Sequence, residues 1–368
     1  MSAPLHSASP DQQAQIGRLE LLDYARFAAA FAVMLFHYLL NGIHNGKINS
    51  LTLSPDIVPV IQYGYLGVEF FFMISGYVIF FSARGRSASA FAVSRAIRLY
   101  PAYWCAICIT SIVAQFWGHG EMQVTLQQAL VNLGMFPGLF DVPYVDGVYW
   151  TLGYELSFYM MVLLMLLAGQ QQRLHLWFLA WPLLMLVALA AERGYLPFLG
   201  NHYAYFSAGA AFAIAREKRS WAVMGALACC LLLCLQFSTG KAATMSASKG
   251  VEYSGLMIGV IVVFMFAFFA VLNTRAGSTL RLPASRLIGD LTYPWYLIHA
   301  HFGYMFLSRF AEDEHKFAWY GLTIILVLVM SYAINQYVEK MAAPLWRRVF
   351  TLGLRPSLDW LQARLRTS

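Results

Sequence analysis

Charged residues are scarce in this sequence. Asp, Glu, Lys and Arg together make up 12% of its 368 residues, whereas 60% are hydrophobic and the mean hydropathy is +0.58. A soluble domain carries about 25% charged residues, which cover its surface in water. The composition therefore excludes an ordinary soluble domain, and we expect a polytopic membrane protein surrounded by a lipid bilayer.

Cysteine is equally scarce. The five cysteines lie inside apolar stretches, and Cys105 and Cys108 form a C-x-x-C pair without a histidine or second cysteine pair at metal-ligand spacing. We interpret all five as small packing residues. The sequence therefore predicts no disulfide framework, no metal site and no permanently bound cofactor, and nothing in it predicts a nucleic-acid partner.

The two ends of the chain differ in composition from the middle. Residues 1–18 lack the basic segment and short apolar run of a cleaved signal peptide, and we expect a disordered cytoplasmic tail. Residues 341–368 mix Trp, Leu and Phe with Arg, which is typical of a basic amphipathic helix on the inner leaflet. Between them we expect one transmembrane domain, residues 19–340.

Long apolar runs fill this domain. Because a helix needs about 20 residues to cross a bilayer, the sequence predicts an all-α protein with about ten transmembrane helices. Ten is an even number, so both termini should lie on one side. The predicted helices span residues 19–41, 64–82, 96–117, 148–168, 174–191, 198–215, 221–237, 253–272, 287–308 and 317–338.

Lys and Arg are distributed unevenly over the connecting segments. With cytoplasmic termini, 19 of the 25 Lys and Arg residues fall on the inner side and 6 on the outer side. This agrees with the excess of positive charge that cytoplasmic segments carry, and we therefore predict cytoplasmic termini. The six outer residues are Lys47, Arg193, Lys241, Lys249, Arg309 and Lys316.

The first predicted helix carries two ionisable residues on one face. Arg26 and His37 are close to three helical turns apart, which separates them by about 16 Å along the axis. An ionisable residue in a membrane helix usually faces a partner or a wet cavity. Two interpretations stay open, namely a structural polar pair and a stripe that lines a functional cavity.

Two further helices carry a glutamate. Glu69 lies near the outer end of the second helix, where it either orients the histidine or reaches the interface. Ser75, in the same helix, serves either close helix packing or a site. Glu155 lies in the fourth helix among aromatic residues that include Trp150 and Tyr154, and we expect it to line a polar cavity.

Arginines and a histidine complete the candidate site. Arg95 and Arg98 lie three residues apart at the cytoplasmic mouth of the third helix. Their guanidinium groups suit phosphate oxygens, although simple anchoring at the inner leaflet would also explain them. His299 falls mid-membrane in the ninth helix, close to the kink that Pro294 permits, and is either a packed residue or part of the site.

Together these residues resemble the acyltransferase-3 family of integral membrane O-acyltransferases. The resemblance covers roughly residues 19–340 and rests on five motifs in the family's order. They are the helix from Arg26 to His37, GVEFFFMISGY at 67–77, SRAIRLYP at 94–101, WTLGYELSFY at 150–159 and LTYPWYLIH at 291–299.

The resemblance implies a ten-helix fold in a bacterial cytoplasmic (inner) membrane. Such a protein takes an acyl group, usually acetyl, from cytoplasmic acyl-CoA and passes it to a hydroxyl of a glycan or lipid-linked sugar at the outer face. The transfer is direct or involves a separate periplasmic transferase. The resemblance implies His37 as the essential histidine, Arg26 as its partner, Glu155 as a further catalytic residue, and Arg95 and Arg98, with Arg26, as the acyl-CoA-binding residues.

Acyl transfer to an alcohol needs a base and positive charge near the developing oxyanion. We predict that His37 is the general base or a transient acyl carrier, and that Glu155 or Glu69 orients its imidazole or binds the sugar. The residues predicted to contact substrate are Glu69, Ser75, Trp150, Tyr154 and His299. The competing prediction is a transporter or flippase of an anionic or sugar-linked lipid, which intramembrane His, Arg and Glu would also serve.

Overall fold

The computed structural model describes residues 19–367, and this part of the chain is helical, without a strand. The tail predicted at residues 1–18 lies outside the described residues. The long helices are α2 (Glu20–Phe36), α5 (Gly67–Ala83), α6 (Ala88–Trp117), α8 (Trp150–Leu167), α9 (Leu174–Ala190), α10 (Tyr203–Glu217), α11 (Trp221–Thr239), α13 (Gly255–Leu272), α15 (Ser285–Phe310), α16 (Lys316–Ala333) and α17 (Ala343–Thr367).

Short helices connect them. The α-helical ones are α3 (Gly42–His44), α4 (Val58–Ile61), α7 (Leu126–Asn132), α12 (Ala242–Lys249) and α14 (Arg275–Thr279). Two segments are π-helical, namely His37–Asn41 and Ile334–Met341. The 3-10 turns are Gln62–Leu66, Gly120–Met122, Pro137–Phe140, Gly147–Tyr149, Gln170–Gln172 and Asp313–His315.

Each of the ten predicted segments contains one long helix, which confirms the all-α class. Among the described residues, seven helical stretches are long and apolar enough to cross a membrane. The count of ten crossings and the cytoplasmic side of the termini stay predictions.

Two helices begin five or more residues away from their predicted starts. The third helix begins at Ala88 rather than 96, because the Ser87 side chain caps it by accepting a hydrogen bond from the Ala90 backbone N–H at 3.2 Å. The sixth begins at Tyr203 rather than 198, because the chain first turns through Asn201, whose φ of 55° is left-handed.

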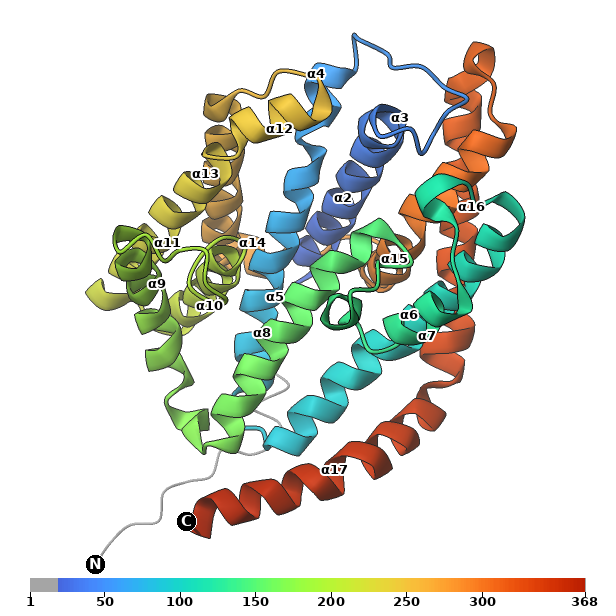
Figure 1. Ribbon diagram of the computed structural model, residues 1–368. Helices are drawn as coiled ribbons and strands as arrows, with labels where there is room; N and C mark the ends of the chain where they lie inside the picture. The colour runs from blue at the N-terminus through green and yellow to red at the C-terminus, as the bar shows by residue number, and fades with distance from the viewer. Residues whose placement is uncertain (1–18, 368) are drawn as a thin grey trace, which may run out of the picture.

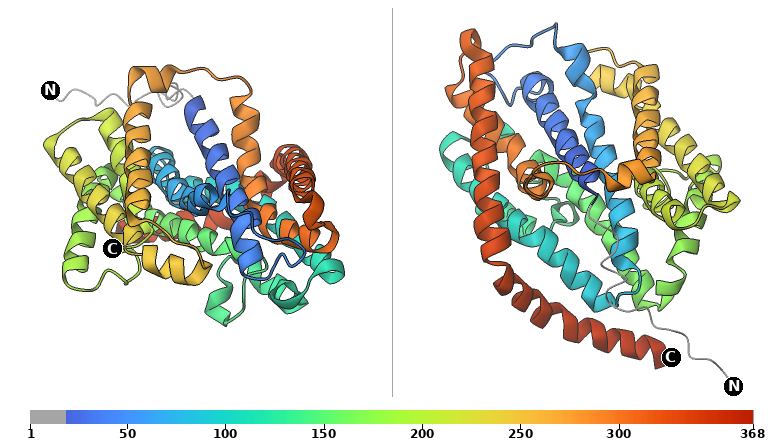
Figure 2. Two further views of the ribbon diagram at one scale, coloured as in Figure 1. Left: turned by 90° about the horizontal axis from the view of Figure 1, so that it is seen from above. Right: turned by 180° about the vertical axis from the view of Figure 1, so that it is seen from behind.

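Two helices that are not among the seven apolar stretches lie inside the bundle. Residues 203–214 of α10 are all buried, and so are residues 291–305 of α15. α15 carries His299 and His301 in this buried stretch. In Figures 1 and 2, α2, α5 and α15 pass through the middle of the bundle, with α9, α11 and α13 on one flank and α16 on the other. A helix shielded from lipid can carry polar residues toward an internal site.

Contacts between segments that are distant in the sequence join helix ends that we predict to lie on the same side of the membrane. On the predicted cytoplasmic side, Arg281 forms an ion pair with Glu20 at 2.9 Å. On the predicted outer side, the Thr52 backbone N–H donates to the Asp313 carboxylate at 2.7 Å. These contacts agree with helices that alternate in direction.

Glycines allow α5 and α10 to pack closely. A Cβ added at Gly76 would lie 1.9 Å from the carbonyl oxygen of Phe206, and one at Gly209 would lie 1.8 Å from that of Met73. Both distances are far below van der Waals contact, so a side chain at either position would push the helices apart. This packing fixes the position of α5, whose other residues reach the site.

The C-terminal helix α17 crosses the end of the bundle at which α6 begins (Figures 1 and 2). The rings of Trp346 and Phe350 pack on Trp104, with centroids 6.0 and 5.9 Å away. Farther along, the Gln362 side chain donates to the carbonyl of Leu166 at 3.3 Å. The predicted amphipathic tail is therefore a helix held against the bundle, and its contact with the inner leaflet stays a prediction.

Candidate active site

Helix α2 connects two pockets. Arg26, near its start, lines one pocket, and His37, just after its end, lines the other. The backbone becomes π-helical over His37–Asn41, a local widening that is frequent at functional sites. We call the two spaces the inner pocket and the outer chamber, after the sides on which the sequence places them.

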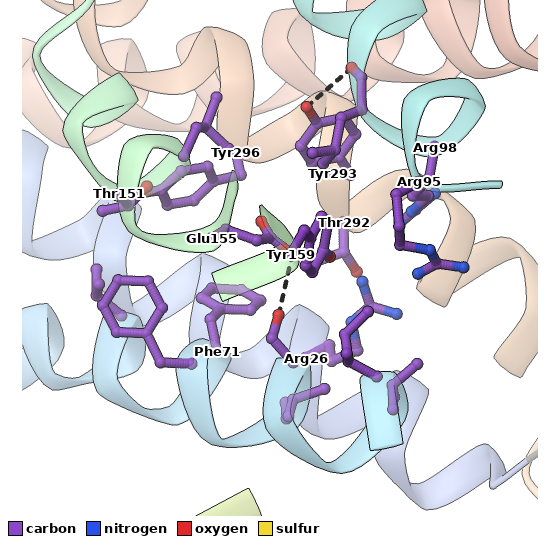
Figure 3. Close-up of a pocket in the computed structure, with 18 residues that line it drawn as sticks. Arg26, Phe71, Arg95, Arg98, Thr151, Glu155, Tyr159, Thr292, Tyr293 and Tyr296 are labelled. Atoms are coloured by element: carbon purple, nitrogen blue, oxygen red, sulfur yellow. Dashed lines mark hydrogen bonds between the residues drawn. The ribbon is translucent and has the colours of Figure 1, made fainter. Parts of the chain in front are cut away.

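The inner pocket is lined by side chains from α2, α5, α6, α8 and α15. Its empty space, including the side that opens to solvent, is about 830 Å³. Arg26, Arg95, Arg98 and Glu155 all face this space (Figure 3). The structure thus brings together four predicted site residues that are far apart in the sequence.

Glu155 is held by two hydroxyl groups. Ser75 Oγ donates to Glu155 Oε1 at 3.0 Å, and the Tyr159 hydroxyl donates to the same oxygen. The Arg95 guanidinium lies 5.9 Å from the centre of the Tyr159 ring. Of the two interpretations of Ser75, the geometry favours a place in the site, because the close helix packing is made by its neighbour Gly76.

Two arginines of the inner pocket have hydrogen-bond donors that are unpaired in the described part of the chain. Arg98 lies 3.7 Å from Glu339 and stacks over Tyr293 at 5.2 Å. The Nε atoms of Arg26 and Arg95 are buried and have no hydrogen-bond partner within residues 19–367. Leaving a buried donor unpaired is costly. The pocket therefore suits an anionic ligand that would supply the missing acceptors.

In the outer chamber, His37 belongs to a hydrogen-bond network. Its Nδ1 is hydrogen-bonded to the Tyr304 hydroxyl of α15. The Asn41 amide nitrogen lies 3.2 Å from His37 Nδ1 and donates to the Tyr304 hydroxyl at 3.1 Å. The Lys249 ammonium donates to Asn41 Oδ1 at 2.6 Å, which fixes the orientation of that amide.

The two carboxylates expected to orient His37 have other neighbours. Glu155 belongs to the inner pocket, because it lies five residues, or about 7.5 Å, into α8 from its outer end. Glu69 does line the outer chamber, but its Oε1 lies 3.6 Å from Nδ1 of His202. The structure therefore does not support a glutamate as the partner of the imidazole, because the His37 Nδ1 is hydrogen-bonded to the Tyr304 hydroxyl, which also accepts a hydrogen bond from Asn41.

His299 lies behind His37 and lines neither pocket. It is fully buried, its Nδ1 is hydrogen-bonded to the Tyr296 carbonyl at 2.8 Å, and its ring centre lies 5.3 Å from that of His37. This position does not support the predicted contact with substrate. His301 does face the chamber, and the buried Asp146 accepts a hydrogen bond from its backbone N–H at 2.8 Å.

Val68 and Tyr296 line both the inner pocket and the outer chamber. The Tyr296 side chain is held in place by a 2.9 Å hydrogen bond between its hydroxyl and Thr151 Oγ1. These two residues therefore mark the boundary at which the two spaces meet.

A third space, the aromatic groove, opens beside the outer chamber. It shares Trp150 and Lys241 with the chamber, and Tyr154, Tyr195 and Asn201 also line it. Rings and polar side chains next to one another suit a ligand with both apolar and hydroxyl surfaces. Trp150 and Tyr154, both predicted to contact substrate, therefore both line the aromatic groove.

Comparison with known proteins identifies the family. The acyltransferase domain of the acyltransferase-3 family matches residues 19–336. The chain belongs to the acyltransferase-3 family. It is also 28% identical over 170 residues to nodulation protein 10 of Rhizobium leguminosarum bv. viciae, which covers 41% of this chain and 45% of that protein. The match thus spans less than half the length of this curated relative, and no solved structure matches the chain.

Family membership confirms the resemblance drawn from the motifs, and it supports a membrane acyltransferase. Sequence reasoning missed four polar residues of this acyltransferase. Asn41 and Tyr159 each lie one helical turn after a predicted site residue, so the i, i+4 spacing could have found them. Tyr304 and Lys249 reach the site from distant segments, and no local spacing predicts their approach.

Proposed function

We propose that this acyltransferase moves an acyl group, acetyl in the simplest case, from cytoplasmic acyl-CoA to a hydroxyl of a glycan or lipid-linked sugar at the outer face of a bacterial inner membrane. The observation that carries the proposal is the meeting of two chemically unlike spaces along α2. One is rich in arginine and suits phosphates, and the other contains His37. They adjoin at Val68 and Tyr296.

The inner pocket is the donor site in this proposal. Arg95 and Arg98 bind phosphates of CoA, since guanidinium groups match phosphate oxygens. The remaining lining, which includes Phe71 and Tyr293, is largely apolar and suits the pantetheine arm. The thioester then lies toward the boundary with the outer chamber. Arg26, whose Nε lacks a partner, is placed to stabilise negative charge on the thioester oxygen.

The chemical step takes place around His37. In the tautomer that carries its hydrogen on Nδ1 and donates it to the Tyr304 oxygen, Nε2 is free to take the proton of the acceptor hydroxyl. The acceptor oxygen attacks the thioester carbonyl, the carbon–sulfur bond breaks, and the departing CoA sulfur receives the proton from Nε2. The alternative, a transient acyl group on His37, would use the same nitrogen.

The test uses purified protein in lipid nanodiscs with acetyl-CoA and envelope glycans of the producing organism. We expect one free CoA thiol for each acetyl group found in the glycan. His37→Ala should lower turnover by about 10²- to 10⁴-fold, the usual contribution of a general base. The control is His175→Ala, which alters an exposed histidine at the start of α9. Wild-type acylation by His37→Ala would contradict the assignment, and lipid movement without thiol release would indicate a flippase.

A further inference from the structure

Positive charge gathers in the outer chamber. Three lysines line it, Lys47, Lys241 and Lys249, and each is half-buried. They come from three separate places in the chain, namely the segment after α3 and the two ends of α12. The lining contains a single carboxylate, that of Glu69, which lies 3.6 Å from His202.

These lysines are held mainly by neutral groups. The Lys241 ammonium donates to Asn201 Oδ1 at 2.6 Å, as Lys249 does to Asn41. Lys47 lies 3.4 Å from His301 Nε2 and 3.5 Å from the carboxylate of Glu121, whose side chain is 86% exposed. Because Glu121 is in water, this ion pair is weaker than one between two buried groups. Three lysines thus lie near two carboxylates, those of Glu69 in the lining and of the exposed Glu121, so the chamber has an excess of positive charge.

Another outer lysine shows a different arrangement. Lys316, which lies outside the chamber, has the carboxylate of Asp313 at 3.7 Å and also donates to the carbonyl of Thr52 at 3.3 Å. Withdrawing a charge from water is costly unless a counter-charge compensates it. At Lys316 the protein supplies that counter-charge. At Lys241 and Lys249 the nearest oxygen belongs to a neutral amide.

We propose that the saccharide acceptor carries an anionic group, a carboxylate or a phosphate, which binds these lysines while the neighbouring hydroxyl lies at His37. This inference rests on the proposed function and names the class of its acceptor. Lys241 lines both the chamber and the aromatic groove. The anionic group therefore binds where the saccharide passes from the groove into the chamber, and Trp150, which lines both spaces, contacts the adjoining ring.

The charge is not needed for the phosphates of CoA. Those bind the arginines of the inner pocket in the proposed function, on the other side of the boundary formed by Val68 and Tyr296. A negatively charged acyl group, in contrast, could reach the lysines from the donor side. The experiment must therefore locate the negative charge either on the acceptor or on the transferred group.

The first test is mass spectrometry of surface glycans from cells that make either the wild-type protein or His37→Ala. We expect the saccharide unit that gains an acyl group only in the wild type to carry a carboxylate or phosphate of its own. The inference is overturned if the saccharide unit that gains the acyl group has no charge of its own. This holds even if the added acyl group is charged. If the glycans of the two strains do not differ, the proposed function fails, and this inference fails with it.

The second test measures kinetics with the acceptor identified in this way. Lys241→Ala should raise the acceptor KM about tenfold, the loss expected for one charge-assisted hydrogen bond, and leave the acetyl-CoA KM unchanged. Lys241→Arg should restore most of the affinity, and the matched control Lys316→Ala should behave as the wild type. An unchanged acceptor KM in the Lys47→Ala, Lys241→Ala double variant, with folding and acetyl-CoA binding intact, would overturn the inference.

Discussion

Replacing Tyr304 by Phe removes one hydroxyl group from the centre of the proposed site. The hydroxyl is hydrogen-bonded to His37 Nδ1 and accepts a hydrogen bond from Asn41 at 3.1 Å. The ring itself stays, and it is closely packed, since a Cβ added at Gly42 would lie 2.5 Å from it. Tyr304→Phe is therefore a local change that leaves the volume of the side chain in place.

The expected effect follows from the bonds that are lost. A buried polar group deprived of its partner costs about 1–3 kcal/mol. Where that partner orients the catalytic imidazole in the transition state, the loss lowers kcat by about 5- to 150-fold. Acetyl-CoA affinity should not change, because Tyr304 lines the outer chamber and does not line the inner pocket.

The chain offers a matched control in Tyr38. Its hydroxyl is also buried and donates to the carbonyl of His299 at 2.6 Å, and its ring centre lies 6.5 Å from that of Tyr304. Tyr38→Phe removes a hydroxyl from the same region without touching the network of His37. The assay compares kcat from thiol release with thermal stability for both variants. Equal kcat values for Tyr304→Phe and Tyr38→Phe would refute the positioning role of Tyr304.

Three more predictions concern the inner pocket and the packing of the helices. Arg95→Ala should weaken acetyl-CoA binding by about tenfold, measured by calorimetry, and leave the acceptor KM unchanged, because a charge-assisted contact to phosphate is lost. Glu155→Gln should tighten CoA binding, since it removes negative charge from among the arginines; weaker binding would contradict the proposed donor site. Gly209→Ala should destabilise the protein in a thermal unfolding assay by about 1–3 kcal/mol, as overpacking does. Gly225→Ala, at an open position of α11, should not, and equal losses would disprove the close α5–α10 contact.

The sequence predicts the helices well because each apolar run is a local signal. It also finds Arg26, Arg95, Arg98 and Glu155, since a charge inside a membrane helix is conspicuous wherever it occurs. Their meeting in one pocket is a tertiary event, which the sequence can suggest only through depth. The depth of Glu155 in the membrane alone would place it beside His37, whereas it lines the inner pocket.

The surroundings of His37 are harder to predict. Its partner Tyr304 is 267 residues away in the chain. Tyrosine is also common at membrane interfaces, so nothing in its local sequence separates it from the other tyrosines. In the sequence, Lys249 is only one of the outer charges from which the orientation of the protein is predicted. Its contact with Asn41 depends on how α12 folds over the end of α2, and helix periodicity holds no information about that.

The central claim is that acyl-CoA enters from the cytoplasmic side and the acyl group leaves on the other. The most direct measurement adds membrane-impermeant acetyl-CoA to sealed vesicles of the two opposite orientations, prepared from cells that make the wild-type protein and the native acceptor. With inverted vesicles, whose cytoplasmic face is outside, we predict release of CoA thiol. With right-side-out vesicles, we predict that the wild-type protein releases no more thiol than the His37→Ala protein. Equal release with both orientations, or release only with right-side-out vesicles, would contradict the account.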